Sequence, residues 1–123
     1  MMEKILPIRR ELFLNDIKLC YREWNEGKTP LLLLHGLGDH SLVWSSLGDY
    51  LVSDYQIIAP DLRGHGESEK PEFGYSFEDY IEDLEQLMME LQWESCHLIG
   101  HSWGAKLACL WAVSYTHLTL PTN

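Results

Sequence analysis

The sequence predicts an α/β fold in which an N-terminal β-hairpin is followed by a doubly wound, mostly parallel sheet. Three observations predict this fold. Short apolar runs alternate with helical patterns, two of the runs are continuously apolar, and the longest helical pattern is strongly amphipathic. Continuous apolarity is typical of strands buried on both faces, as in a parallel sheet. The 123 residues fit one domain and contain no internal repeats.

The first elements are expected to form the hairpin. Residues 11–14 and 17–24 are short extended runs, and Asn15-Asp16 between them favours a tight turn. The next run, 30–35, is continuously apolar up to His35 and ends at a glycine. It is therefore predicted to be a buried strand.

A helix over residues 41–52 and a second buried strand over 55–60 are predicted next. One face of this helix is apolar. Its members are Leu42, Trp44, Leu47 and Leu51.

The clearest helix is predicted over residues 77–92. Ser76 is a suitable N-cap with Asp79 three residues further on, and apolar side chains recur with i, i+3, i+4, i+7 spacing. The opposite face is acidic, and we expect it to be solvated rather than to bind a partner. Its members are Glu78, Glu82, Asp83, Glu85 and Glu90.

A short strand over residues 96–100 and a helix over 103–112 complete the predicted elements. Residues 113–123 match neither that helix nor a connecting loop, and they resemble a sequencing adapter translated in frame. We therefore expect residues 1–112 to be the N-terminal part of one domain and 113–123 to be a non-native tail, which removes His117 from the candidates.

The composition excludes several classes of function. Nineteen acidic residues against nine basic ones give a formal net charge of −10, which is expected to repel nucleic acid and anionic membranes. No stretch has membrane-spanning length, and polar residues interrupt any secretory leader. The cysteines at positions 20, 96 and 109 lack CxxC spacing, so we expect free thiols in a reducing cytoplasm and no structural zinc site.

The chemistry is expected at Gly100-His101-Ser102-Trp103-Gly104, a G-x-S-x-G motif between an apolar strand and a helix. Such a turn exposes the serine hydroxyl, and glycine on each side avoids collisions within the bend. The backbone N–H of Trp103, at the start of the helix, would then face a negative oxygen forming on a substrate. The alternative is a structural turn in which Ser102 only caps the helix.

Two other glycine-rich segments favour the catalytic interpretation. His35-Gly36-Leu37-Gly38 follows the buried strand, in a position where the backbone N–H of Leu37 is a second candidate donor. The polar segment 61–68 follows the next strand.

Together the motifs H-G-L-G-D, D-L-R-G-H-G-E-S and G-H-S-W-G-A resemble the α/β-hydrolase superfamily, most closely its small esterases, lactonases and carbon–carbon bond hydrolases. The resemblance covers residues 17–112 and implies a partial α/β-hydrolase fold, truncated after the nucleophile helix. It implies that Ser102 is a nucleophile forming an acyl-enzyme with a small ester, lactone or thioester. Leu37 and Trp103 would be the backbone oxyanion donors, and no metal or organic cofactor is implied. A serine in place of the aspartate of related dehalogenases and epoxide hydrolases implies a carbonyl substrate.

The family supplies its acid and histidine after the nucleophile, and we expect both to be missing from this chain. The histidines in the motifs, including His101, are expected to pack or to form hydrogen bonds within loops, and His35 above all. We therefore expect the 123-residue chain to be catalytically silent. A free edge on the strand before Ser102 is also expected to make it poorly soluble.

Within the enzyme class, acyl transfer to an acceptor other than water, carbon–carbon cleavage and peptide-bond hydrolysis stay open, because they use the same elbow. Two other functions also stay open. Some proteins of similar fold bind small molecules without turnover. In addition, Gly36-Leu37-Gly38, with Asp61 about 20 residues further on, approximates a Rossmann dinucleotide-binding fingerprint, although Ser41 replaces its third glycine. In each case the expected partner is a small molecule, and the oligomeric state is not predicted.

Overall fold

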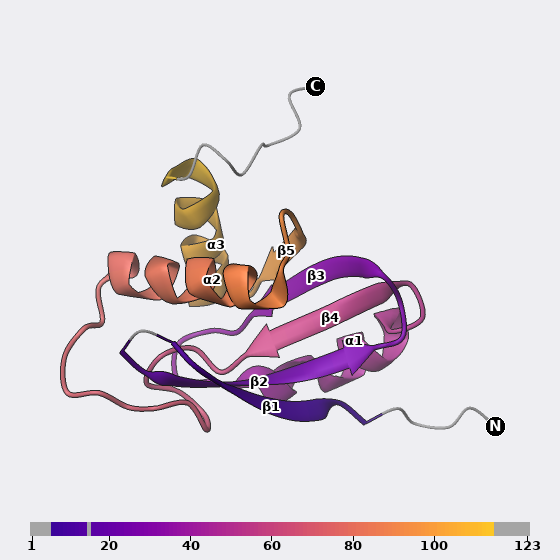
Figure 1. Cartoon of the computed structure of the whole chain (residues 1–123), viewed down its shortest axis with the longest axis horizontal. Coiled ribbons are helices and arrows are strands. Elements are labelled where there is room, and N and C mark those ends of the chain that lie inside the picture. The colour runs from indigo at the N-terminus through magenta and orange to yellow at the C-terminus, as the bar shows by residue number, and fades with distance from the viewer. Residues whose placement is uncertain (1–5, 15, 115–123) are drawn as a thin grey trace.

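A computed structural model describes residues 6–14 and 16–114, which form an α/β structure around one five-stranded sheet (Figure 1). The strand order is β1-β2-β4-β3-β5. The strands are β1 (Ile8–Phe13), β2 (Lys18–Asn25), β3 (Thr29–Leu34), β4 (Tyr55–Pro60) and β5 (His97–Gly100). The hairpin β1–β2 is antiparallel, β2 pairs with β4 in the antiparallel sense, and β3 is parallel to both β4 and β5. The predicted hairpin and the parallel strands that follow it are confirmed, within a mixed sheet that has two antiparallel and two parallel pairings.

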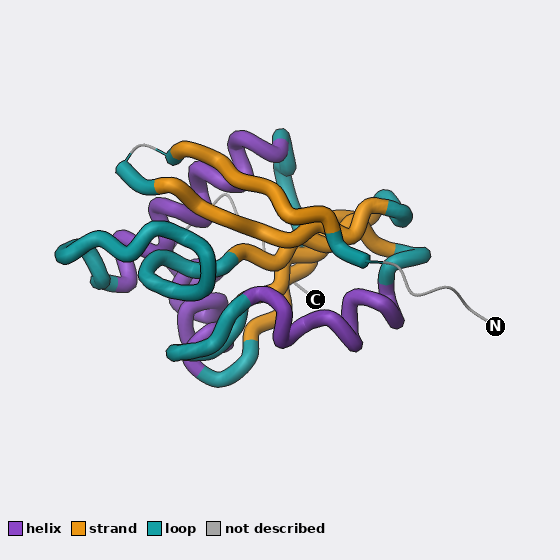
Figure 2. Tube along the Cα trace, turned by 90° about the horizontal axis from the view of Figure 1, so that it is seen from below, coloured by secondary structure: helices purple, strands orange, loops and turns teal. Residues whose placement is uncertain are grey.

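Helices cover both faces of the sheet (Figure 2). Leu32 and Leu34 of β3 pack with α2 (Phe77–Leu91) and α3 (Trp103–Ser114) on one face. Leu31 and Leu33, which alternate with them, pack on the other face. Because consecutive strand residues point to opposite faces, a strand covered on both sides must be apolar throughout. The continuous run in the sequence has this cause.

The second face is covered by a helix that changes type along its length. It begins as the 3₁₀ helix η1 (Ser41–Trp44) and continues as α1 (Ser45–Leu51). Trp44, Leu47 and Leu51 pack against the sheet as predicted, but Leu42 is exposed. The reason is the tighter 3₁₀ turn, which rotates its side chains away from the face expected for an α-helix.

Helix α2 has the predicted N-terminus. The Ser76 side chain accepts from the Asp79 backbone, and the Asp79 carboxylate accepts from the Ser76 backbone, which is a complete capping box. The predicted solvated acidic face is wrong at Asp83, which is only 3% exposed. Its carboxylate accepts two hydrogen bonds from the Arg63 guanidinium, each 2.9 Å long. A buried cation from the preceding loop therefore turns one acidic residue inward.

The C-terminal part of the sheet ends in an open edge. Within the described residues β5 pairs only with β3, and Ile99 on β5 is 38% exposed. Helix α3 runs two residues into the predicted tail, and the rest of that tail, 115–123 with His117, lies outside the described residues, as does Asn15. No helix in the described part is long and apolar enough to cross a membrane. The thiols of Cys20, Cys96 and Cys109 are free.

Candidate active site

Ser102 lies at a sharp bend between β5 and α3. The N–H of His101 donates to the Leu34 carbonyl (3.0 Å), next to the last β5–β3 pair. The N–H groups of Gly104 and Ala105 already donate to the carbonyls of His101 and Ser102, which begins the helix. Ser102 itself is exposed and has a left-handed φ of 57°. A non-glycine residue in this region costs on the order of 1–3 kcal/mol, so the surrounding packing must hold it there.

The two glycines of the motif allow main-chain segments to touch. A Cβ at Gly100 would lie 2.4 Å from the Gly104 carbonyl oxygen, inside the bend. A Cβ at Gly104 would lie 2.4 Å from the carbonyl oxygens of Leu34 and His35, at the end of β3. The first glycine closes the bend, as predicted. The second presses the helix start against the neighbouring strand, a contact that the motif alone does not reveal.

The segment after β3 forms a tight turn beside this bend. The N–H of Asp39 donates to the Gly36 carbonyl (3.1 Å), and Gly38 has φ 79°, a conformation that favours glycine. Leu37 at the tip is 70% exposed. A Cβ at Gly36 would stand 3.4 Å from the Ser102 Cβ, so a single added methyl group would bring the turn into contact with the bend.

Two backbone donors belong to these neighbouring segments. Among the described residues, neither the N–H of Leu37 nor that of Trp103 makes a hydrogen bond. The Ser102 hydroxyl likewise has no partner in residues 6–14 and 16–114. Two segments with unused N–H donors therefore adjoin Ser102.

His35 is fixed by hydrogen bonds on both ring nitrogens. It is fully buried; Nδ1 donates to the Gly36 carbonyl (2.7 Å), while Nε2 accepts from the N–H of Leu62 (3.0 Å). The Leu62 donor requires a neutral ring with its proton on Nδ1. Burial also lowers the pKa of His35 below its ordinary value. The expected hydrogen bond within the loop is confirmed, and the ring has no nitrogen left for proton transfer.

Asp61 holds the segment at Ser41, which follows the turn at Gly36–Asp39. It is buried, its Oδ1 accepts from the N–H of Ser41 (2.6 Å), and its Oδ2 accepts from the N–H of Glu67 (3.0 Å). A Cβ at Gly66 would lie 2.4 Å from the Asp61 carboxyl carbon, so only glycine fits there. An Asp61 used in this way is not available to a ribose, contrary to the Rossmann alternative.

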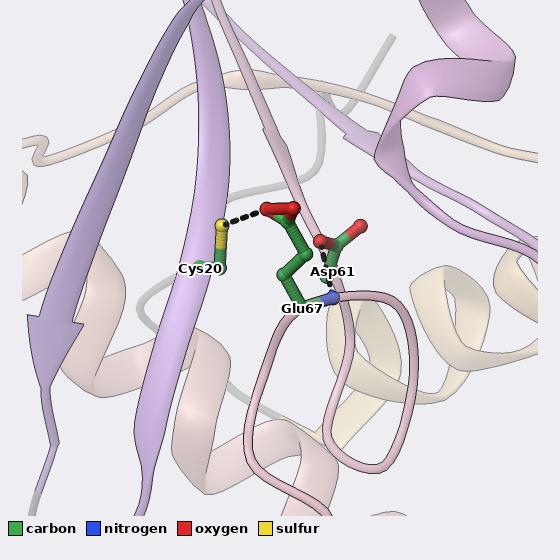
Figure 3. Close-up of side chains that lie close together, drawn as sticks. All are labelled: Cys20, Asp61 and Glu67. Atoms are coloured by element: carbon green, nitrogen blue, oxygen red, sulfur yellow. Dashed lines mark hydrogen bonds between the residues drawn. The ribbon is translucent and has the colours of Figure 1, made fainter.

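Cys20, Asp61 and Glu67 form a cluster whose potential ligand atoms lie within 4.8 Å of one another (Figure 3). The Cys20 thiol donates to Glu67 (3.7 Å), and burial raises the pKa of that thiol to about 11. Arg22 and Arg9 pair with the same Glu67 oxygen at 3.2 and 2.5 Å. Since the guanidinium groups already neutralise this carboxylate, we interpret the cluster as an ion-pair network.

The Trp103 side chain joins the first turns of α3 and α2. Its ring stacks on Phe77 (centroids 5.3 Å apart) and meets Tyr80 edge-on (4.8 Å). This packing was not predicted, although the i, i+3 spacing of the two partners on one helix face was a usable signal. The indole therefore fixes the start of α3, where the N–H of Trp103 lies.

Comparisons with known proteins agree with this geometry. A family model described as "alpha/beta hydrolase fold" matches residues 29–120. The chain belongs to this family. The Rossmann alternative is therefore wrong, and the partial α/β-hydrolase fold implied by the motifs is confirmed.

Several relatives of this α/β-hydrolase chain are named hydrolases. It is 38% identical over 112 residues to 2-(acetamidomethylene)succinate hydrolase of Mesorhizobium japonicum, covering 90% of this chain and 40% of the relative. It is 36% identical over 96 residues to mouse epoxide hydrolase 4, covering 76% and 27% of the two chains. The chain thus spans well under half the length of these curated relatives.

Solved structures of the family superpose well on the chain. A crystal structure of E-2-(acetamidomethylene)succinate hydrolase gives a TM-score of 0.83 at 36% identity, covering 92% of this chain and 42% of that one. A haloalkane dehalogenase from Bradyrhizobium elkanii gives 0.84 at 31% identity, covering 92% and 38%. The described sheet and helices therefore correspond to one part of a larger fold in each of these proteins.

Proposed function

We propose that the whole protein containing this chain is a serine hydrolase that acts on a small carboxylic ester, lactone or thioester. The observation that carries the proposal is the exposed Ser102 in a left-handed backbone conformation, next to two segments whose N–H donors are unused. A non-glycine residue held in a left-handed backbone conformation is stable only at a cost, and such residues cluster at functional sites.

The proposed reaction follows from these groups. The Ser102 oxygen adds to the substrate carbonyl carbon, and the carbonyl oxygen becomes an anion that accepts from the N–H groups of Leu37 and Trp103. Its charge is also favoured by the N-terminal end of α3. Collapse expels the alcohol or thiol and leaves an acyl-serine, which water hydrolyses to the acid and free Ser102. Each oxyanion donor is expected to contribute about 2.7–4 kcal/mol to the transition state.

A general base is needed to accept the serine proton. His35 cannot supply it, because both ring nitrogens are engaged. We place the base and its acidic partner outside residues 6–114, in the remainder of the whole protein. The 123-residue chain alone is then inactive.

The identity of the nucleophile decides among the chemistries of the relatives. Epoxide hydrolases and a haloalkane dehalogenase are among them, but a covalent ester intermediate on an alkyl carbon needs a carboxylate nucleophile, and position 102 is a serine. The relative named for 2-(acetamidomethylene)succinate supports hydrolysis of a small carboxylic acid derivative. The net negative charge favours a small-molecule substrate over nucleic acid. The free thiols favour, as a further proposal, a cytoplasmic location.

Turnover of p-nitrophenyl acetate by the whole protein tests the proposal, with Ser102→Ala as the paired variant. We expect the substitution to lower kcat by about 10⁴-fold or more, because it removes the covalent step. Equal turnover by the two proteins would contradict it. Equal unfolding midpoints in urea provide the control that Ser102→Ala still folds.

A further inference from the structure

We propose that His35 is a positioning residue for the oxyanion site: its Nδ1–H holds the Gly36 carbonyl and thereby sets the direction of the Leu37 N–H. The inference rests on the proposed function, because it assigns to Leu37 a donor role in that reaction. His35 itself touches no reacting atom.

The first step is the geometry of one peptide unit. The carbonyl of Gly36 and the N–H of Leu37 belong to the same planar unit, and the described chain contains no cis peptide bond. In a trans unit these two groups point in opposite directions. Whatever fixes the Gly36 carbonyl therefore fixes the Leu37 N–H on the opposite side.

The second step is that the Gly36 carbonyl is held twice. It accepts from His35 Nδ1 at 2.7 Å and from the N–H of Asp39 at 3.1 Å. A carbonyl oxygen has two lone pairs, so its acceptor capacity is filled. Rotating this peptide would break both hydrogen bonds and would leave the buried imidazole without an acceptor.

The third step explains why the proton is on Nδ1. The N–H of Leu62 points at Nε2, so a proton there would place two donors face to face. The titratable groups that act on the His35 ring are Asp61, Asp39 and His65. The centroid of the His65 ring lies 5.0 Å from that of His35. Leu62, which follows β4, therefore selects the tautomer that orients a peptide following β3.

The final step connects this peptide to the reaction. Gly36 lies against the elbow, with a would-be Cβ 3.4 Å from the Ser102 Cβ, and the Leu37 N–H has no partner among the described residues. The two hydrogen bonds that link Leu62 to His35 and His35 to Gly36 thus orient the Leu37 N–H, a donor next to the proposed nucleophile.

Two substitutions separate positioning from simple support. The carboxamide of His35→Asn can place an N–H near the Nδ1 site and keep the bond to Gly36, while losing the bond to Leu62. The longer carboxamide of His35→Gln can accept from Leu62 at the Nε2 site, while losing the bond to Gly36. Each variant gives up one of the two hydrogen bonds, so each is the matched control for the stability of the other.

The experiment measures kcat, KM and urea unfolding of the whole protein in both variants. We expect similar losses of stability, a kcat for H35N within about threefold of wild type, and a kcat for H35Q lowered about 10- to 100-fold with little change in KM. That range is smaller than the 10²–10³-fold loss from removing an oxyanion donor, because the N–H is misdirected rather than deleted. Equal kcat in the two variants, or a kcat that follows stability alone, would overturn the inference.

The Leu37 amide resonance in a ¹⁵N-labelled whole protein gives a readout that does not require turnover. Both variants lose the ring current of the imidazole, so H35N gives the reference position, and we expect the resonance to be displaced or broadened in H35Q relative to H35N. An unmoved resonance in H35Q overturns the positioning role even if Ser102 is the nucleophile. Absence of Ser102-dependent turnover in the wild type overturns the proposed function, while a displaced Leu37 resonance in H35Q would still support the orientation of the peptide.

Discussion

The Ser102 elbow and the turn at Gly36–Asp39 lie side by side but are held in different ways. The elbow is shaped mainly by neighbouring residues, since Gly100 packs inside the bend and the N–H groups of Gly104 and Ala105 bind the carbonyls of His101 and Ser102. The turn is shaped by residues far along the chain, since His35 binds Leu62 and the N–H of Ser41 binds Asp61. The comparison teaches that a short motif can encode the nucleophile, whereas its partner donor depends on tertiary structure.

The largest effect on stability is expected where remote support is buried and charged. Arg63→Met leaves the Asp83 carboxylate buried without its guanidinium partner. Breaking such a pair costs about 3–5 kcal/mol in the free energy of unfolding. Urea unfolding of the whole protein measures this. A loss below about 1 kcal/mol would mean that segment 61–68, and with it Asp61 and Leu62, does not need this anchor.

Gly104→Ala tests how closely the elbow packs against the end of β3. The new Cβ meets the main-chain oxygens of Leu34 and His35, at the end of β3, at 2.4 Å, and these cannot move as a flexible side chain would. We expect a loss of about 1–3 kcal/mol in the free energy of unfolding. The matched control is Gly38→Ala, which meets no atom within 4 Å and is penalised only for its φ of 79°. An unchanged or increased free energy of unfolding in Gly104→Ala would contradict the close contact.

Asp61→Asn tests the remote support of the turn with one atom changed. The amide retains one oxygen acceptor but turns an NH₂ toward the N–H of either Ser41 or Glu67. The expected cost is about 1–3 kcal/mol, since one buried donor loses its acceptor. Equilibrium unfolding measures it. A lower kcat with an unchanged KM would show that the geometry of the turn depends on Asp61. An unchanged kcat and an unchanged free energy of unfolding would show that the turn keeps its geometry without this remote support.

The smallest expected effect is a pH dependence from His35. Burial lowers its pKa in the folded protein, so the folded state favours the neutral ring. Its contribution to stability is therefore fully present above the unfolded value of about 6.5 and is lost as the pH falls through the lower folded pKa. Comparing unfolding free energies at pH 7.5 and pH 5.5 in wild type and H35N should show a larger acid loss in wild type. An equal or smaller loss would contradict a buried neutral ring.

The sequence predicted much of the fold because the local signals were strong. The apolar run at β3, the capping box of Ser76 and the amphipathic pattern of α2 gave strands and helices within a few residues of those observed. Leu42 and Asp83 were misplaced for different reasons, a 3₁₀ turn in the first case and a buried Arg63 in the second.

The candidate site was predictable to a different degree in its two parts. The sharp bend at Ser102 and the need for glycine followed from G-x-S-x-G, and the structure shows both. The hydrogen bonds of His35 to Leu62 and of Asp61 to Ser41 link residues that are 27 and 20 positions apart in the chain. No local pattern determines such pairings, because they arise only when β3 and β4 lie next to one another in the sheet.

Labelling with a fluorophosphonate tests the central claim about Ser102 most directly. Intact-mass and peptide mapping of the treated whole protein should show one phosphonyl group on the peptide carrying Ser102, formed rapidly and absent from Ser102→Ala. A non-catalytic binding protein would label slowly or not at all. Rapid labelling that persists in Ser102→Ala, or no labelling of the folded wild-type protein, would contradict the assignment of Ser102 as the nucleophile.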